Sequence, residues 1–173
     1  MKTKLALATL IAGFGLAGAA ASVSAATATG QFNVKLTVTK TCSVVTTTDL
    51  DFGSQASTAT NITANNGSVT VACSKNTPYT IGLLPSAANG GTANGTGSMK
   101  SATTGELVAY SLFQDAANTV WGNTTGTGGN VKSGNRLAAA TANQVHTVFG
   151  KVAALDVTPS TDYLDVVAVT VTY

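Results

Sequence analysis

An uninterrupted alternation of apolar and polar residues near the start of the chain constrains the fold more than any other feature. In residues 27–39, TATGQFNVKLTVT, large apolar side chains occupy one side of an extended strand and polar side chains the other. Burying the four large ones contributes roughly 6–12 kcal/mol, comparable to the stability of a whole domain, about 5–15 kcal/mol. The surface that receives this strand therefore depends on it. That surface belongs either to the same domain or to another molecule. The apolar row consists of Phe32, Val34, Leu36 and Val38, and Ala28 and Gly30 continue it upstream.

The residues before this strand have the pattern of a secretory signal peptide. Lys2 and Lys4 form a positive start, residues 5–21 are an apolar run, and residues 23–25 offer small side chains for cleavage. We expect cleavage after Ala25. A retained membrane anchor is the alternative, which the polar sequence that follows disfavours. No later run is long enough to span a bilayer, so we expect no membrane insertion after cleavage.

The charges of the exported part balance. Of nine basic residues, Lys2 and Lys4 belong to the signal, which leaves seven against seven acidic residues. A neutral domain gives no electrostatic reason to expect nucleic acid or an anionic membrane surface as partner. Thr, Ala, Gly, Asn, Ser and Val dominate, a composition typical of an extracellular β protein with polar loops.

Two cysteines, Cys42 and Cys73, lie outside the signal. An even count in an exported protein favours one disulfide. Both cysteines lie in β-like contexts, so the bond is expected to join two neighbouring strands and to contribute about 3–4 kcal/mol. Metal-binding or catalytic thiols are the alternative, and they lack a cluster of partner residues.

Strand-like segments follow residue 40, separated by polar turns. Turns or loops are predicted at 65–67, 89–98 and 122–134, which are rich in Asn and Gly. A short segment, 119–121, is expected to pair back on the strand before it. About six strands is close to the roughly seven of an immunoglobulin-like sandwich, but boundaries read from sequence carry errors of several residues. The predicted strands span 42–46, 68–73, 79–84, 106–113, 144–152 and 163–173.

An ordered set of motifs across the exported chain resembles the spore coat protein U domain family, whose better-known members are major subunits of archaic chaperone–usher pili. Each motif alone is weak, whereas the ordered set is specific. The motifs are 41–44 (TCSV), 50–53 (LDFG), 69–73 (VTVAC), 108–115 (VAYSLFQD), 119–122 (TVWG), 148–150 (VFG) and 163–165 (YLD), the last running into an alternating strand.

The resemblance implies an all-β, incomplete immunoglobulin-like sandwich that lacks its final strand. In that family a periplasmic chaperone supplies the missing strand, and an outer-membrane usher exchanges it for the N-terminal extension of the next subunit, an established form of strand addition. By this resemblance, residues 26–38 are a donor-strand extension and residues 39–173 the pilin domain. The donor residues would be Gly30, Phe32, Val34, Leu36 and Val38. Tyr173, the final residue, is a candidate for contact with the chaperone through its terminal carboxylate.

The sequence offers little for catalysis, so we expect no enzyme. His146 is the only histidine and lies in a β run, where a strand-face side chain is the ordinary interpretation. Two Asp pairs, 49 with 51 and 162 with 165, flank turns or strand ends, where Asp commonly bonds to the backbone. Trp121 is expected to be a packing residue, with contact to a sugar as the alternative. No cofactor or metal is expected.

We therefore expect a structural subunit of a surface pilus, exported through the periplasm. Each copy would offer its extension to a groove on the next, and such a head-to-tail contact forms an open fibre. Adhesion and biofilm formation follow from the resemblance alone. The alternative is a monomeric, secreted carbohydrate-binding sandwich that folds its own N-terminal strand into its sheet.

Overall fold

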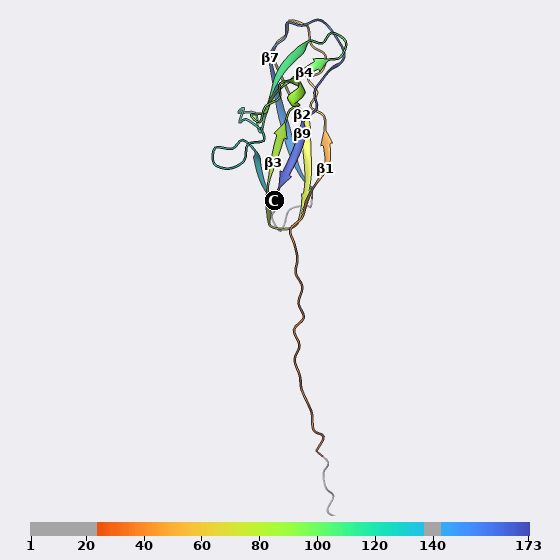
Figure 1. Cartoon of the computed structure of the whole chain (residues 1–173), viewed down its shortest axis with the longest axis vertical. Helices are drawn as coiled ribbons and strands as arrows, with labels where there is room; N and C mark the ends of the chain where they lie inside the picture. The colour runs from red at the N-terminus through yellow and green to blue at the C-terminus, as the bar shows by residue number, and fades with distance from the viewer. Residues whose placement is uncertain (1–23, 137–142) are drawn as a thin grey trace, which may run out of the picture. The chain divides into compact units, whose positions relative to one another are not determined.

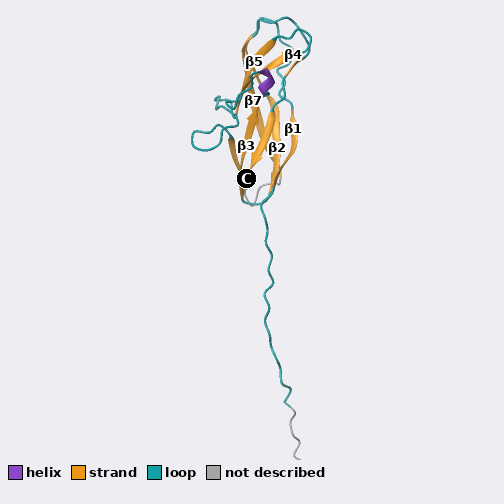
Figure 2. Ribbon diagram, viewed as in Figure 1, coloured by secondary structure: helices purple, strands orange, loops and turns teal. Residues whose placement is uncertain are grey.

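The computed structural model describes residues 24–136 and 143–173, and from Cys42 onward these residues form two antiparallel sheets (Figure 1). The larger sheet has the strand order β1-β2-β7-β5-β4-β8, and the smaller has the order β6-β3-β9. The described residues contain one short 3-10 helix, η1 (Ala87–Asn89) (Figure 2). The all-β prediction, with strands in two sheets, is confirmed. The strands are β1 (Cys42–Thr48), β2 (Thr60–Cys73), β3 (Thr77–Leu84), β4 (Thr96–Ser101), β5 (Leu107–Phe113), β6 (Lys132–Arg136), β7 (Asn143–Ala154), β8 (Tyr163–Leu164) and β9 (Ala168–Thr172).

Each of the six predicted strands overlaps a strand of the structure, and the last, 163–173, overlaps two. The short segment before Trp121 pairs back on β5 as expected, through a bridge between Phe113 and Val120 and a bond from Trp121 N to Leu112 O (3.0 Å). The predicted signal peptide, residues 1–25, lies almost wholly outside the described residues.

The predicted turn at residues 65–67 is wrong, because β2 continues through it. Pairing with β7 shifts register between Ala64 and Gly67, which marks a bulge rather than a reversal. Asn66 bonds across to the segment after β1, with its side-chain amide donating to Asp51 O (2.9 Å) and its Oδ1 accepting from Asp51 N (3.0 Å). The turn-forming residues therefore serve to kink a long strand.

Each of the two segments predicted as loops, 89–98 and 122–134, contains the start of a strand. β4 begins at Thr96, inside the segment 89–98, and β6 begins at Lys132, inside 122–134. Their sequences, TGSMKS and KSGNR, are poor in β-branched and aromatic residues, so local propensity gave no signal. Both form because a neighbouring strand, β5 or β3, supplies the pairing partner.

The longest predicted strand, 163–173, divides between the two sheets. β8 pairs with β4 in the larger sheet, whereas β9 pairs with β3 in the smaller. The predicted inward row holds for Val167, Val169 and Val171, which are partly buried against the core, but Tyr173 is 57% exposed. The chain thus crosses from one sheet to the other at residues 165–167.

The core packs around Trp121, whose side chain is fully buried and donates from Nε1 to Ile81 O (2.8 Å). Lys132 lies with its ammonium 5.2 Å from the centre of the indole. The ring is inaccessible, so it is a packing residue as expected, and the alternative of sugar contact has no support. Apolar residues from β2, β3, β5 and β7 complete the core, among them Val71, Ile81, Leu83, Leu112 and Val152.

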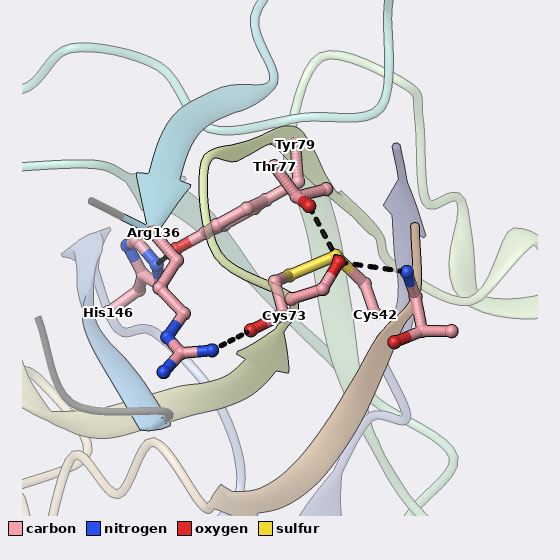
Figure 3. The surroundings of a disulfide bond; sticks show 8 residues. Cys42, Cys73, Thr77, Tyr79, Arg136 and His146 are labelled. Carbon is pink, nitrogen blue, oxygen red and sulfur yellow. Dashed lines mark hydrogen bonds between the residues drawn. A yellow bond between two sulfur atoms is a disulfide. The ribbon is translucent and has the colours of Figure 1, made fainter. Parts of the chain in front are cut away.

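The disulfide joins Cys42 and Cys73, as predicted, at the first residue of β1 and the last of β2 (Figure 3). Around it, Ser74 Oγ accepts from Thr41 N (3.1 Å) and bonds to Thr77 Oγ1 (2.7 Å), and Arg136 Nη1 donates to Cys73 O (2.9 Å). The bond fixes the start of an edge strand that otherwise has one neighbour, β2.

Two glycines make room for the segment that follows β1. A Cβ on Gly150 would lie 2.4 Å from Leu50 Cδ2 and 2.8 Å from Phe52 Cζ, and one on Gly67 would lie 2.9 Å from Leu50 Cβ. Leu50 and Phe52 are therefore seated directly on the backbones of β2 and β7. This contact explains the apolar residues of the sequence LDFG.

Replacing Gly150 with Val is expected to lower the free energy of unfolding by about 1–3 kcal/mol, because Leu50 and Phe52 must move to admit the new side chain. Urea denaturation measures the change. The matched control is Ala153→Val, since Ala153 is exposed on the same strand. Equal effects of the two substitutions would contradict this packing.

Replacing both cysteines with Ala is expected to lower the free energy of unfolding by about 3–4 kcal/mol through the entropy of the unfolded chain. The measurement is denaturation of the variant, with the reduced wild-type protein as the parallel sample. A loss below about 1 kcal/mol would mean that β1 is held by its ladder with β2 alone.

Candidate functional site

A cavity of about 980 Å³ lies between the two sheets and forms the candidate site, which we call the groove. Its floor consists of inward-facing side chains from both sheets, and segments 47–57 and 155–169 border it. A volume of this size is large for a closed core, since packed interiors hold few voids larger than a water molecule. The aliphatic, Met and Phe residues that line it are Leu50, Phe52, Ile62, Val69, Leu83, Met99, Val108, Leu112, Val148, Val152, Leu155, Val157, Leu164, Val166, Val167 and Val169.

Two edge strands flank the groove. β1 is the first strand of the larger sheet and β9 the last of the smaller one, so in the described part of the chain each is paired on one side. Thr47 and Thr48 of β1 and Val169 of β9 line the cavity. An edge strand presents a row of N–H and C=O groups to any strand that comes beside it. The groove therefore combines apolar depth with main-chain donors and acceptors.

Polar residues at the groove are hydrogen-bonded among themselves. Tyr110 Oη donates to Asp165 Oδ2 (2.6 Å), and Asp165 Oδ1 accepts from Asn89 Nδ2 (2.8 Å). Burial, then the bond to Asp165 and its negative charge, raises the pKa of Tyr110. The phenol is therefore neutral, and this network fixes the crossing between β8 and β9 rather than offering a reactive group.

The predicted donor residues are exposed. Phe32, Val34, Leu36 and Val38 are 80–88% accessible to solvent, and residues 24–41 contain no strand. A Cβ on Gly30 would meet no atom within 4 Å. The chain divides into two units, Met1–Thr37 and Val38–Tyr173, and the groove belongs to the second. Four large apolar side chains in a row, left in water, are unusual for a soluble segment without a partner.

Residues 32–38 have the length and the alternation of an extended strand. Residues 32–38 are seven residues, as many as β1 has, and such a strand spans about 20 Å at roughly 3.3 Å per residue. Burial of the apolar row contributes roughly 6–12 kcal/mol.

The residues considered for catalysis have structural partners. Tyr79 Oη lies 2.8 Å from His146 Nε2, with the two rings edge to face, and burial raises the pKa of Tyr79. Burial and then the charge of Lys132 lower the pKa of His146. His146 is a half-buried side chain of β7, as the sequence indicated.

At least one carboxylate of each Asp pair accepts hydrogen bonds from a neighbouring turn or loop. Asp51 Oδ1 accepts from Gly53 N (2.8 Å). Asp162 accepts from Ser101 Oγ (2.6 Å), from Thr103 N (2.9 Å) and Oγ1 (2.8 Å), and from Ser160 Oγ, and these bonds lower its pKa. Asp here closes turns, as expected. In the described residues no three His, Cys, Asp or Glu side chains gather as metal ligands would.

Sequence reasoning identified the donor candidate but not the groove. Met99, Leu155 and Val157 line it from segments without strand periodicity, and only the tertiary packing brings them beside Val169. The sequence feature that could have identified Met99, Leu155 and Val157 is that each is an apolar residue in a mainly polar segment. Nor does any described helix have the length and apolar character that crossing a bilayer requires.

Comparisons with known proteins agree with the motifs. The model of the family described as Spore Coat Protein U domain matches residues 28–170. No curated protein matches the chain. Among solved structures, the chain is similar to one in the crystal structure of the CsuC–CsuE chaperone–tip adhesion subunit pre-assembly complex from archaic chaperone–usher Csu pili of Acinetobacter baumannii, with 26% identity and a TM-score of 0.46. That similarity covers 79% of this chain and 40% of the other, so this chain spans less than half of its length.

Acidification is expected to destabilise the fold through His146. Burial, and then the charge of Lys132, hold the pKa of folded His146 below its ordinary value. The unfolded chain therefore binds the proton more readily, and stability that is present above the unfolded pKa is lost as the pH falls through the folded pKa. In unfolding measurements between pH 7 and pH 5, His146→Gln should show a smaller loss than wild type. Tyr79→Phe, which keeps the buried ring, is the control for packing. An identical pH slope in wild type and His146→Gln would contradict this account.

Proposed function

This chain belongs to the Spore Coat Protein U domain family, and from that premise we propose that it is a structural subunit of a surface pilus assembled by a chaperone and an usher. One observation carries the proposal: the chain has a groove with apolar lining beside two edge strands, and also an exposed segment with an alternating apolar row. Each copy inserts residues 26–38 into the groove of another copy. The domain that receives it comprises residues 39–173, after removal of residues 1–25.

The physical basis of assembly is completion of the core. Phe32, Val34, Leu36 and Val38 direct their side chains into the groove, with Gly30 at a shallow position, and the main chain pairs with the edge strands. The contact is head to tail, because donor segment and groove are different surfaces of the same molecule, and such contacts extend without closing. The product is an open fibre.

A chaperone is needed before assembly. An unfilled groove exposes apolar side chains and sheet edges, both of which favour aggregation. A periplasmic chaperone that lends a strand protects the groove, and an outer-membrane usher exchanges that strand for the extension of the next subunit. Tyr173, which follows β9 and is exposed, is our candidate for chaperone contact. Adhesion and biofilm formation are the roles we propose for the fibre at the cell surface.

The alternative, a monomeric carbohydrate-binding module, lacks a specific observation in its favour. Its candidate sugar contact, Trp121, is fully buried. It also requires residues 27–38 to form a strand of their own sheet, and these residues carry no strand in the structure.

A charge placed on the inward row is expected to abolish fibres. Leu36→Asp forfeits about 1.5–3 kcal/mol of apolar burial, which is roughly a ten- to hundred-fold loss of affinity, and it adds the cost of desolvating a carboxylate. Fibre yield is measured by shearing cells and by gel analysis of undenatured fibres.

The matched control is Thr37→Asp, which places the same charge on the polar row. It should assemble nearly as wild type, and both variants should retain the unfolding transition of the domain. Deletion of residues 26–38 should give a subunit that still binds its chaperone but does not polymerise. Equal fibre yields from Leu36→Asp and Thr37→Asp would refute the proposed donor strand.

A further inference from the structure

The acidic residues gather in the half of the domain away from the disulfide. Asp49 and Asp51 follow the end of β1, Asp156 follows the end of β7, and Glu106 precedes β5. Asp165 bonds to Tyr110 and Asn89, and Asp162 bonds to Ser101 and Thr103. Of the seven acidic residues of the chain, only Asp115 lies elsewhere, close to Lys132. Three of them, Asp49, Asp51 and Asp165, line the groove, and its lining in the described chain contains no Lys or Arg.

Three basic residues, Lys40, Lys75 and Arg136, lie at the opposite end, beside the disulfide. Lys40 precedes Thr41, whose carbonyl accepts from Ser74 N (2.8 Å), and Lys75 lies in the connection between β2 and β3. Arg136 donates to Cys73 O. Lys40 is also joined to the donor segment by the chain itself, and Lys35 lies on the polar row of that segment. The two remaining lysines of the acidic half, Lys100 and Lys151, lie on outward-facing positions of β4 and β7 and do not line the groove.

Within one molecule these two groups of charges scarcely interact. β2 runs from one end to the other with fourteen residues, about 45 Å at roughly 3.3 Å per residue, whereas the screening length is about 8 Å at physiological ionic strength. The hydrogen-bond partners of these charged groups are neutral. Asp162 accepts from Ser101 and Thr103, and Arg136 donates to the carbonyl of Cys73. Asp49, Asp156, Lys40 and Lys75 are exposed and available to another molecule.

We propose that the acidic rim of the groove, formed by Asp49, Asp51, Asp156 and Asp165, docks the basic base, formed by Lys40, Lys75 and Arg136, of the next copy of this chain. The inference rests on the proposed function, and it adds a charged contact between the bodies of successive subunits to the insertion of the apolar row. Opposite charges of this kind guide encounter and select the partner more than they raise affinity.

The contact also fixes the direction in which the donor strand enters. Because Lys40 lies just after Val38, docking on the acidic rim places the end of the donor segment in the acidic half and Phe32 near the disulfide. The strand then runs parallel to β1 and antiparallel to β9, since β1 begins and β9 ends at the disulfide end (Figure 1). The reverse direction would bring Lys40 against Lys75 and Arg136 of the acceptor, a like-charge contact.

The test is a charge swap in the full exported subunit. Its self-association is followed by light scattering at about 20 and 200 mM salt in wild type, in Asp49→Lys with Asp156→Lys, in Lys40→Glu with Lys75→Glu, and in the variant with all four changes. The matched control, Lys100→Glu with Lys151→Glu, makes the same change in net charge as the second variant on the outer sheet face. We expect each reversal at one end to slow association at low salt by roughly tenfold, the fourfold swap to restore most of the rate, and the control to resemble wild type.

Zero-length crosslinking with a carbodiimide provides a direct readout. Lys40 and Asp156 are too far apart to be joined within one copy, so a peptide that links them identifies contact between copies. Such a link in assembled fibres is expected. Its absence, together with reversals that match the control or a fourfold swap that restores nothing, would overturn the charged contact.

A labelled peptide of residues 26–41 separates this inference from the proposed function. If the peptide binds the wild-type subunit but the charge reversals have no effect, the charged contact is wrong and the donor strand stands. If the peptide does not bind, the donor strand is wrong, and the dependence of association on charge reversal still decides the contact between ends.

Discussion

The structure is organised around the space beside β1 and β9, the two edge strands that flank the groove. Each of these strands is paired on one side in the described chain, and a cavity of about 980 Å³, lined by apolar and polar residues, lies beside them. Sheet edges and apolar side chains both lose free energy when left in water. The apolar side chains from Phe32 to Val38 are also exposed to water, and no described part of the chain covers them. In the function we propose, the exposed row of one copy fills the groove of another, so that both surfaces are removed from water.

The groove keeps its shape because its borders are anchored independently of any occupant. The disulfide fixes the start of β1 to the end of β2, and Leu50 and Phe52 fix the segment after β1 through contact with Gly67 and Gly150. On the other side, the bonds of Asp165 to Tyr110 and Asn89 hold the crossing between the two sheets just before β9. A preformed groove loses less conformational entropy when a strand enters.

The positions of the charged residues distinguish the two ends of the domain. The chain is neutral after the expected loss of Lys2 and Lys4, yet three acidic residues line the groove and three basic residues, Lys40, Lys75 and Arg136, lie at the disulfide end. The net charge of zero therefore does not reveal that acidic and basic side chains lie at different ends of the domain. A head-to-tail fibre is the assembly in which such a separation brings opposite signs together.

The sequence by itself determined the fold class, the disulfide and the inward row of the final strand, because alternation, cysteine count and β-propensity are local properties. Its alternating pattern also predicted that residues 27–38 form a strand whose apolar side must be buried against another surface. Tertiary structure alone decided where β4 and β6 form, since TGSMKS and KSGNR become strands only beside β5 and β3. It also turned the Asn-Gly signal at 65–67 into a bulge, divided 163–173 between two sheets, and assembled the groove from Met99, Leu155, Val157 and Val169. The physical reason is that a groove is a property of the space between sheets, and residues far apart in sequence carry no local record of the space they will share.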